Sequence, residues 1–133
     1  MTSPVVETEV AAENWVDAWT RGWPSGDVDS ISALYAEDAR FWSQPTREPH
    51  APREYLEWVF GLQASATCRF GRPIVQGDRA AVNWWAVIED RDGTIETVAG
   101  TSLLRFASDG RTVGQRDAFG SLPGRVELPD WAC

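Results

Sequence analysis

Basic residues are scarce in this chain, and lysine is absent altogether. The 133 residues include 12 arginines against 20 aspartates and glutamates, so the formal net charge is −8 at pH 7. Proteins bind nucleic acids and anionic membranes largely through lysine and arginine. The charge therefore argues against both kinds of partner.

Cysteine and histidine are also rare. Cys68 and Cys133 are too few for a disulfide framework, and the single histidine, His50, argues against a zinc site. No apolar run approaches the ~20 residues of a membrane span, and no signal peptide is evident. A phosphate-binding glycine loop and a nucleophile elbow are missing as well. We therefore expect a cytoplasmic protein that needs no metal or cofactor.

Tryptophan, in contrast, is abundant, with eight residues in a chain that is 43% hydrophobic. The length suits one domain. We expect this domain to span residues 9–121, between a flexible amino terminus (1–8) and a carboxy-terminal tail (122–133). Buried indoles need hydrogen-bond partners, so this many tryptophans indicate a lined cavity or, as the alternative, a filled aromatic core.

The first half of the chain has helical patterns. Trp15, Trp19 and Trp23 recur every four residues, which predicts a helix from Val10 that ends at Pro24–Gly26. Asp27 is a suitable N-cap for a second helix, with Tyr35 on its apolar face and its end near Glu37–Asp38.

A short strand at Ala39–Ser43 and a polar loop at Gln44–Ala51 should follow. Pro52 is well placed for the first turn of a third helix.

The second half has the composition of β-strands. Asp92-Gly93 and Asp109-Gly110 are typical hairpin turns. The β-rich runs are Thr67–Gln76, Arg79–Asp90, Thr94–Ala107 and Thr112–Phe119. Helices followed by an antiparallel meander predict the α+β class.

With this order of elements, the chain resembles the nuclear transport factor 2-like superfamily, and within it the SnoaL-like and ketosteroid-isomerase-like proteins. The segments that carry this resemblance are Trp15-Val16-Asp17-Ala18-Trp19, Leu34-Tyr35-Ala36-Glu37-Asp38-Ala39, Gly100–Phe106 and Gln115-Arg116-Asp117-Ala118-Phe119. The resemblance implies a cone in which a curved antiparallel sheet wraps a long amino-terminal helix, with three helices in all. It also implies a cavity for a small molecule and a homodimer through the outer face of the sheet.

The catalytic residues of the ketosteroid isomerases are not present at the corresponding positions of this chain. The position of their first-helix tyrosine holds Trp15, that of their base holds Ser43 or Gln44, and that of their second aspartate holds Ser102. None of these side chains can act as a carboxylate base. We therefore do not expect ketosteroid isomerisation.

Asp117 is the main catalytic candidate. Strand alternation places it on one face with Gln115, and the resemblance implies that this face lines the cavity. A carboxyl group among indoles should have a raised pKa and could act as an acid or base. The alternative is an ion pair with Arg40, Arg69 or Arg72. His50, in a loop at the mouth of the cone, is a weaker catalytic candidate.

The remaining pocket residues are expected to bind the substrate. Trp84 and Trp85 must point to opposite faces of their strand, and the resemblance places Trp84 inward. The expected lining is Trp15, Trp19, Tyr35, Phe41, Tyr55, Trp58 and Trp84, with Ser102 and Gln115 positioning a substrate oxygen.

These residues favour a SnoaL-like protein that binds a hydrophobic small molecule, with cofactor-free cyclisation, isomerisation or dehydration of a carbonyl compound as the candidate chemistry. A non-catalytic binding or dimerisation module is the first alternative. An epoxide hydrolase is the second; it would need two carboxylates and an amide around one water. Only Asp117 is expected to point inward, because Asp90 is expected in a solvated turn.

Overall fold

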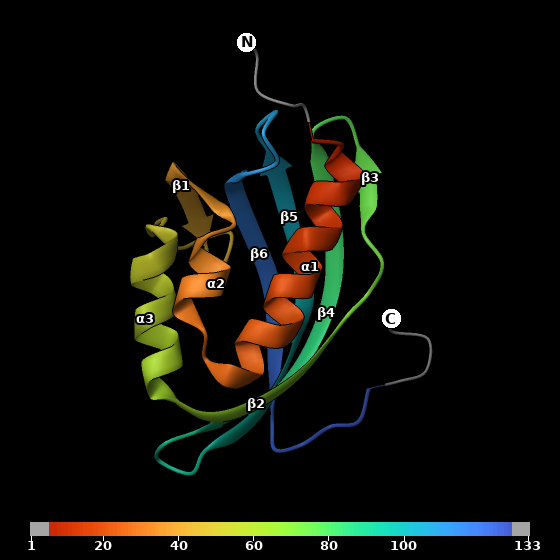
Figure 1. Ribbon diagram of the computed structural model, residues 1–133. Coiled ribbons are helices and arrows are strands. Elements are labelled where there is room, and N and C mark those ends of the chain that lie inside the picture. Colours follow the sequence, from red (N-terminus) through yellow and green to blue (C-terminus); the bar gives the residue numbers. More distant parts are fainter. Residues whose placement is uncertain (1–5, 129–133) are drawn as a thin grey trace.

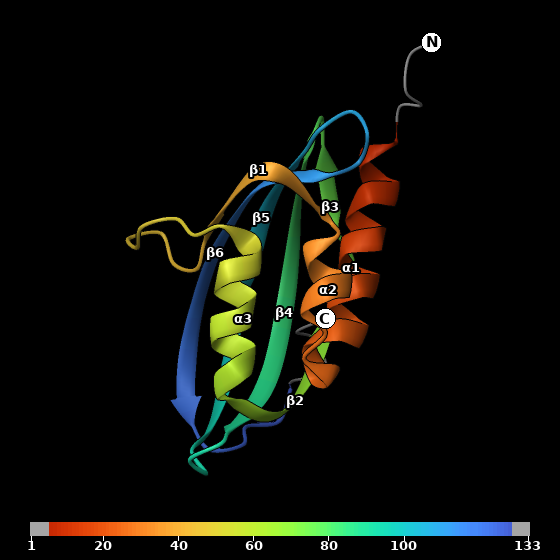
Figure 2. The ribbon, with the colours of Figure 1, turned by 60° about the vertical axis from the view of Figure 1, so that its left-hand side comes forward.

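The computed structural model describes residues 6–128, in which three helices lie on one side of a strongly curled sheet (Figures 1 and 2). The helices are α1 (Thr8–Ser25), α2 (Val28–Ser32) and α3 (Pro52–Leu62). The strands are β1 (Tyr35–Trp42), β2 (Gln63–Phe70), β3 (Ile74–Gln76), β4 (Arg79–Asp90), β5 (Ile95–Phe106) and β6 (Thr112–Pro123). The predicted α+β class and cone are confirmed.

Helix α1 is the axis around which the sheet curls. Trp15 and Trp19 are buried on its inner face, while Trp23 is half-buried near its end. Gly26 ends the helix with φ 64°, a left-handed conformation that glycine adopts without a Cβ penalty. The predicted first helix and its apolar face are therefore correct. The amino terminus (1–8), expected to be flexible, lies in part outside the described residues. Within them, the Val6 N–H donates a backbone hydrogen bond to the Ser108 carbonyl.

The second helix is shorter than predicted. Asp27 does cap α2 through a hydrogen bond from the Ser30 N–H, but the helix ends at Ser32. Tyr35, predicted on this helix, instead begins β1. The backbone of this segment pairs with β6, starting with the Thr112 N–H that donates to the Leu34 carbonyl. Pairing with a distant strand here overrides a local helical pattern.

The third helix begins at Pro52 as predicted, but the first long β-run is divided. It forms β2 and β3, which are separated by Gly71–Pro73, and β2 begins at Gln63, directly after α3. Pro73 has no N–H for a ladder hydrogen bond, which favours a break at this point.

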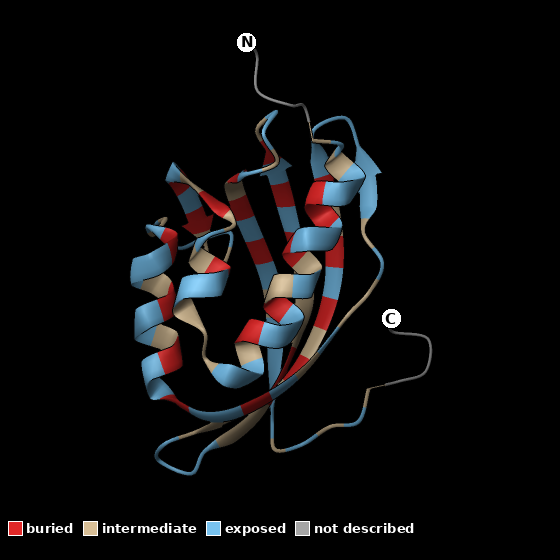
Figure 3. Cartoon of the chain, in the orientation of Figure 1, coloured by how far each residue is buried: buried red, intermediate tan, exposed pale blue. Residues whose placement is uncertain are grey.

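The sheet has the strand order β1-β6-β5-β4-β2, with β3 also paired to β4. Strands β4, β5 and β6 form the predicted antiparallel meander. Strand β1 is parallel to β6, so the sheet is mixed at this edge. Figure 3 shows buried residues alternating with more exposed ones along the long strands. No helix of the described residues is long and apolar enough to span a membrane.

The segment after β6 folds back onto the outer face of the sheet. The Thr97 hydroxyl donates to the Gly124 carbonyl at 2.7 Å, and the Trp85 indole donates to the Val126 carbonyl at 3.2 Å. Trp85 thus faces outward as predicted, and the chain's own tail covers part of it. Trp131, later in this tail, lies outside the described residues.

The close approach of β5 and β6 at Gly100 gives a test of this packing. A Cβ at Gly100 would clash with the Ala118 carbonyl oxygen and lie 2.5 Å from the Phe119 Cβ. We predict that Gly100→Ala lowers the free energy of unfolding by about 1–3 kcal/mol, the usual cost of overpacking, in urea titrations. Gly114→Ala is the matched control, because nothing lies within 4 Å of its Cβ position. Equal stability of the two variants would contradict the packing described here.

Candidate active site

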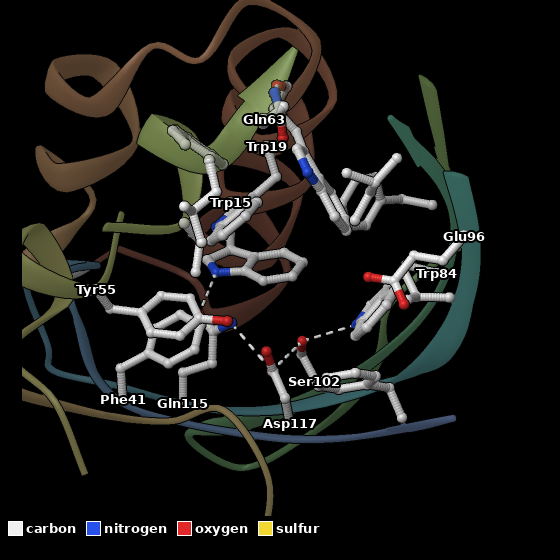
Figure 4. Close-up of a pocket in the computed structure, with 18 of the residues that line it drawn as sticks. Trp15, Trp19, Phe41, Tyr55, Gln63, Trp84, Glu96, Ser102, Gln115 and Asp117 are labelled. Atoms are coloured by element: carbon white, nitrogen blue, oxygen red, sulfur yellow. Dashed lines mark hydrogen bonds between the residues drawn. The ribbon is translucent and has the colours of Figure 1, made fainter. Parts of the chain in front are cut away.

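A cavity of about 210 Å³ lies between the helices and the concave face of the sheet (Figure 4). It exceeds the roughly 150 Å³ of an apolar protein cavity that holds benzene. The wall is mainly aromatic, and these lining residues are Trp15, Trp19, Trp23, Phe41, Tyr55, Phe60, Phe70, Trp84 and Phe119. Aromatic rings from the helices and the sheet therefore line this space.

Asp117 is the polar centre of this wall. Its side chain projects inward from β6 and is only 8% exposed. The Ser102 hydroxyl donates to Asp117 Oδ1 at 2.5 Å, and Gln115 Nε2 donates to the same oxygen at 3.0 Å. No hydrogen bond from the described residues reaches Oδ2. One carboxyl oxygen is thus held by two donors, and the other has no hydrogen-bond partner among the described residues.

The two donors to Asp117 are themselves oriented by indoles. The Trp84 indole donates to the Ser102 oxygen at 2.9 Å, which directs the Ser102 proton towards Asp117 (Figure 4). The Trp15 indole and the Tyr35 hydroxyl both donate to Gln115 Oε1, so the Gln115 NH₂ group must face Asp117. The wall therefore fixes both hydrogen bonds to the carboxyl group.

Burial raises the pKa of Asp117 to about 7, against the opposing effect of the hydrogen bonds from Ser102 and Gln115. The ion pairs formed within residues 6–128 do not include Asp117. The predicted alternative, neutralisation by Arg40, Arg69 or Arg72, is therefore wrong for the described chain, and all three arginines are exposed. Asp117 can exchange a proton near neutral pH.

Tyr55 supplies a neutral hydroxyl to the same cavity. Burial raises its pKa to about 12, and the negative charge of Asp117 adds to this shift. Its ring stacks on Phe41, with centroids 4.6 Å apart, and its hydroxyl points into the cavity (Figure 4). No described side chain hydrogen-bonds this hydroxyl. It is free to donate to a ligand oxygen.

Three predicted site residues do not line the cavity. Tyr35 lies behind the wall, where its hydroxyl joins the indoles to Gln115. Trp58 is 57% exposed, because Leu56 and Phe60 take the inner face of α3. His50 pairs with Phe41 through the backbone, and its ring lies against Tyr55 and Trp58. The predicted residues that do line it are Trp15, Trp19, Phe41, Tyr55, Trp84, Ser102, Gln115 and Asp117.

Sequence analysis also missed part of the lining. Asp90 and Glu96 are half-buried and line the cavity, so the expectation of a single inward carboxyl group is wrong. Asp90 shares its strand face with Trp84, and Glu96 shares its face with Ser102. Strand parity, already used for Trp84, could therefore have found both. Among the described residues, His, Cys, Asp and Glu side chains form no group of three or more that could hold a metal ion.

A sequence model of the SnoaL-like domain matches residues 12–115. The structure is similar to that of the epoxide hydrolase/cyclase-like enzyme SalBIII, which has a role in pyran ring formation in the polyether salinomycin (21% identity, 86% of this chain and 93% of that one, TM-score 0.74). It is also similar to a candidate scytalone dehydratase from Novosphingobium aromaticivorans (12% identity, 89% and 88%, TM-score 0.73).

A protein of unknown function from Exiguobacterium, described as NTF2-like, is a third similar structure (17% identity, 83% and 98%, TM-score 0.69). At these identities the likeness concerns the fold. A comparison with curated proteins found no match.

The raised pKa of Asp117 predicts an unusual pH dependence of stability. Below about pH 4, the folded and unfolded states both keep this proton. As the pH rises from about 4 to 7, only the folded state keeps it. Asp117 therefore lowers the free energy of unfolding progressively, by roughly 4 kcal/mol at most. Urea titrations should therefore find Asp117→Asn more stable than the wild type at pH 8 and similar to it at pH 4.

Glu13→Gln, which removes an exposed carboxyl group from α1, is the matched control and should follow the wild type. If Asp117→Asn and the wild type lose stability equally between pH 4 and pH 8, Asp117 is not a buried proton-binding group.

Proposed function

Because the chain belongs to the SnoaL-like domain family, we propose that it is an enzyme that binds a hydrophobic carbonyl compound and moves a proton with Asp117. One observation carries this proposal. Asp117 is buried without an arginine partner in the described chain, and its Oδ2 is free on the side of an aromatic cavity. A purely structural carboxyl group would gain from an ion pair or from a second set of donors, whereas a catalytic group needs one free oxygen.

The proposed step begins with the ionised form of Asp117. Oδ2 takes a proton from the carbon next to the substrate carbonyl, the electron pair of that C–H bond forms a C=C bond, and the π pair of the carbonyl moves to its oxygen to give an enolate. The Tyr55 hydroxyl donates a hydrogen bond to this oxygen. A pKa of about 7 keeps both forms of Asp117 populated at neutral pH, which suits a group that must accept and return a proton.

The protonated Asp117 then completes the reaction. Returning the proton to a different carbon gives an isomer, and giving it to a leaving hydroxide gives water and a dehydrated product. Ser102 and Gln115 were expected to position a substrate oxygen, but their hydrogen bonds go to Asp117. In this proposal they orient the carboxyl group, and Tyr55 takes over the contact with the substrate oxygen.

Epoxide hydrolysis is less well supported. The carboxyl groups missed by sequence analysis do lie in the cavity, but Glu96 is six positions along β5 from Ser102, the residue paired with Asp117. This spacing does not favour one water shared by two carboxylates. A homodimer through the outer face of the sheet and a cytoplasmic location stay predictions. The exposed Leu103 on the outer face of β5 is a natural contact for such a dimer.

Proton exchange tests the proposed step without knowledge of the natural substrate. The protein is incubated in D₂O with a panel of hydrophobic ketones that quench its tryptophan fluorescence, and deuterium at the α-carbon is followed by NMR. We predict that Asp117→Asn lowers the exchange rate by roughly 10²–10⁴-fold, the usual contribution of a general base. The substitution should leave ketone binding within a few-fold, because asparagine keeps the shape and can accept the hydrogen bonds to Oδ1.

Asp38→Asn, which changes an exposed carboxyl group on β1, is the control and should exchange at the wild-type rate. Saturable binding with the same exchange rate in the wild type and in Asp117→Asn would contradict the proposed chemistry and would indicate a protein that only binds its ligand.

A further inference from the structure

The end of the cavity away from Asp117 has its own set of polar groups. Asp90 is the last residue of β4 and Glu96 is the second residue of β5, on either side of the hairpin turn that joins these strands. Gln63 is paired with Asp90 at the start of β2, so all three residues lie at one end of the sheet. Glu96 is six positions from Ser102, roughly 20 Å along an extended strand. The cavity is therefore polar at both ends and apolar between them.

Every polar group at this end can accept a hydrogen bond. Gln63 is only 8% exposed, and its Nε2 donates to the Trp23 carbonyl at 2.8 Å, so the amide orientation is fixed and Oε1 is left without a partner among the described residues. The carboxyl groups of Asp90 and Glu96 likewise form no ion pair within the described chain. Figure 4 shows Glu96 turned inward, on the side of the cavity that Trp84 occupies.

Aromatic rings surround the space between these acceptors. Trp84 is 5.7 Å from Trp23 and 5.8 Å from Phe119 between ring centroids, and Trp23 is 6.3 Å from Phe70. These rings pack around Trp84, and all four line the cavity; Trp23 and Phe70 also pack against the main core. A set of aromatic faces with nearby carboxylates is the environment in which proteins bind ammonium groups, because the faces and the carboxylates both attract positive charge.

The lining contains no histidine or arginine to compensate these charges. Arg91 follows Asp90 in the chain but is exposed and outside the lining. A ligand that carries a carboxylate would be repelled here. A neutral ligand would offer these acceptors no positive charge.

We propose that Gln63, Asp90 and Glu96, with the rings of Trp23 and Trp84, form a subsite for a protonated or alkylated amine. The ligand is then an elongated molecule with a cationic amine at this end and an apolar body. The position of a carbonyl group at the other end of this ligand rests on the function proposed for Asp117. The amine subsite itself does not depend on that function.

Three matched ligands test the subsite. They are phenyl ketones with the same alkyl chain, ending in a trimethylammonium, a hydroxyl or a carboxylate group, and their dissociation constants are measured by tryptophan quenching. The ammonium ligand should bind most tightly and the carboxylate ligand most weakly. Glu96→Gln should weaken the ammonium ligand by about 5- to 10-fold, as expected for one half-buried charge contact, and change the hydroxyl ligand less than twofold.

Glu89→Gln is the matched control, because Glu89 lies on β4 outside the cavity lining and should leave all three constants unchanged. Equal affinity for the ammonium and carboxylate ligands, or an equal loss for all three in Glu96→Gln, would overturn the subsite. So would the absence of saturable binding by the ammonium ligand. The two proposals can fail separately: an ammonium preference in a wild type that exchanges no α-proton supports the subsite and rejects the chemistry.

Discussion

The burial of one carboxyl group in an aromatic wall is the constraint on which the rest of this site depends. Asp117 cannot be solvated by water on all sides, and no arginine of the described chain neutralises it. The protein stabilises it with two hydrogen bonds to one oxygen, from Ser102 and Gln115. Each of these donors is oriented by further groups that also need partners, so the polar side chains of the wall form one connected network.

This network also explains how so many tryptophans are accommodated. A buried indole N–H without a partner costs free energy, and here Trp15, Trp19 and Trp84 all donate to the side chains that support Asp117. The same rings form the apolar wall of the cavity. Packing and chemistry therefore use the same residues, and the raised pKa of Asp117 is a cost in stability that this arrangement tolerates.

Sequence reasoning found the parts of the site that follow from local periodicity. The spacing of Trp15 and Trp19 depends only on helix geometry. Strand alternation separates Trp84 from Trp85 and groups Asp117 with Gln115, while the family resemblance supplied which of these faces points inward. Sequence reasoning failed at Tyr35, where pairing with a distant strand replaced a helix, and at Trp58, where Leu56 and Phe60 took the inner face of α3. Such choices depend on tertiary contacts that no local pattern records.

A different limit applied to Asp90 and Glu96, whose strand parity was available. They were missed because charged residues beside a turn are usually solvated, whereas here both residues line the cavity, at one end of a strongly curled sheet (Figure 2). The course of that curl depends on long-range pairing along the 12-residue strands.

The two ends of the cavity also act on each other through charge. A cation held near Glu96 would favour the ionised form of Asp117, because opposite charges stabilise one another. At roughly 20 Å and an effective dielectric constant of about 20, the attraction is about 0.8 kcal/mol, which lowers the pKa of Asp117 by roughly half a unit. Since this pKa lies near 7 in the free protein, a cationic ligand would convert much of the remaining acid into base as it binds. The buried carboxyl group can thus remain partly neutral in the empty cavity, where its charge would be costly, and become more ionised when a ligand brings the compensating charge.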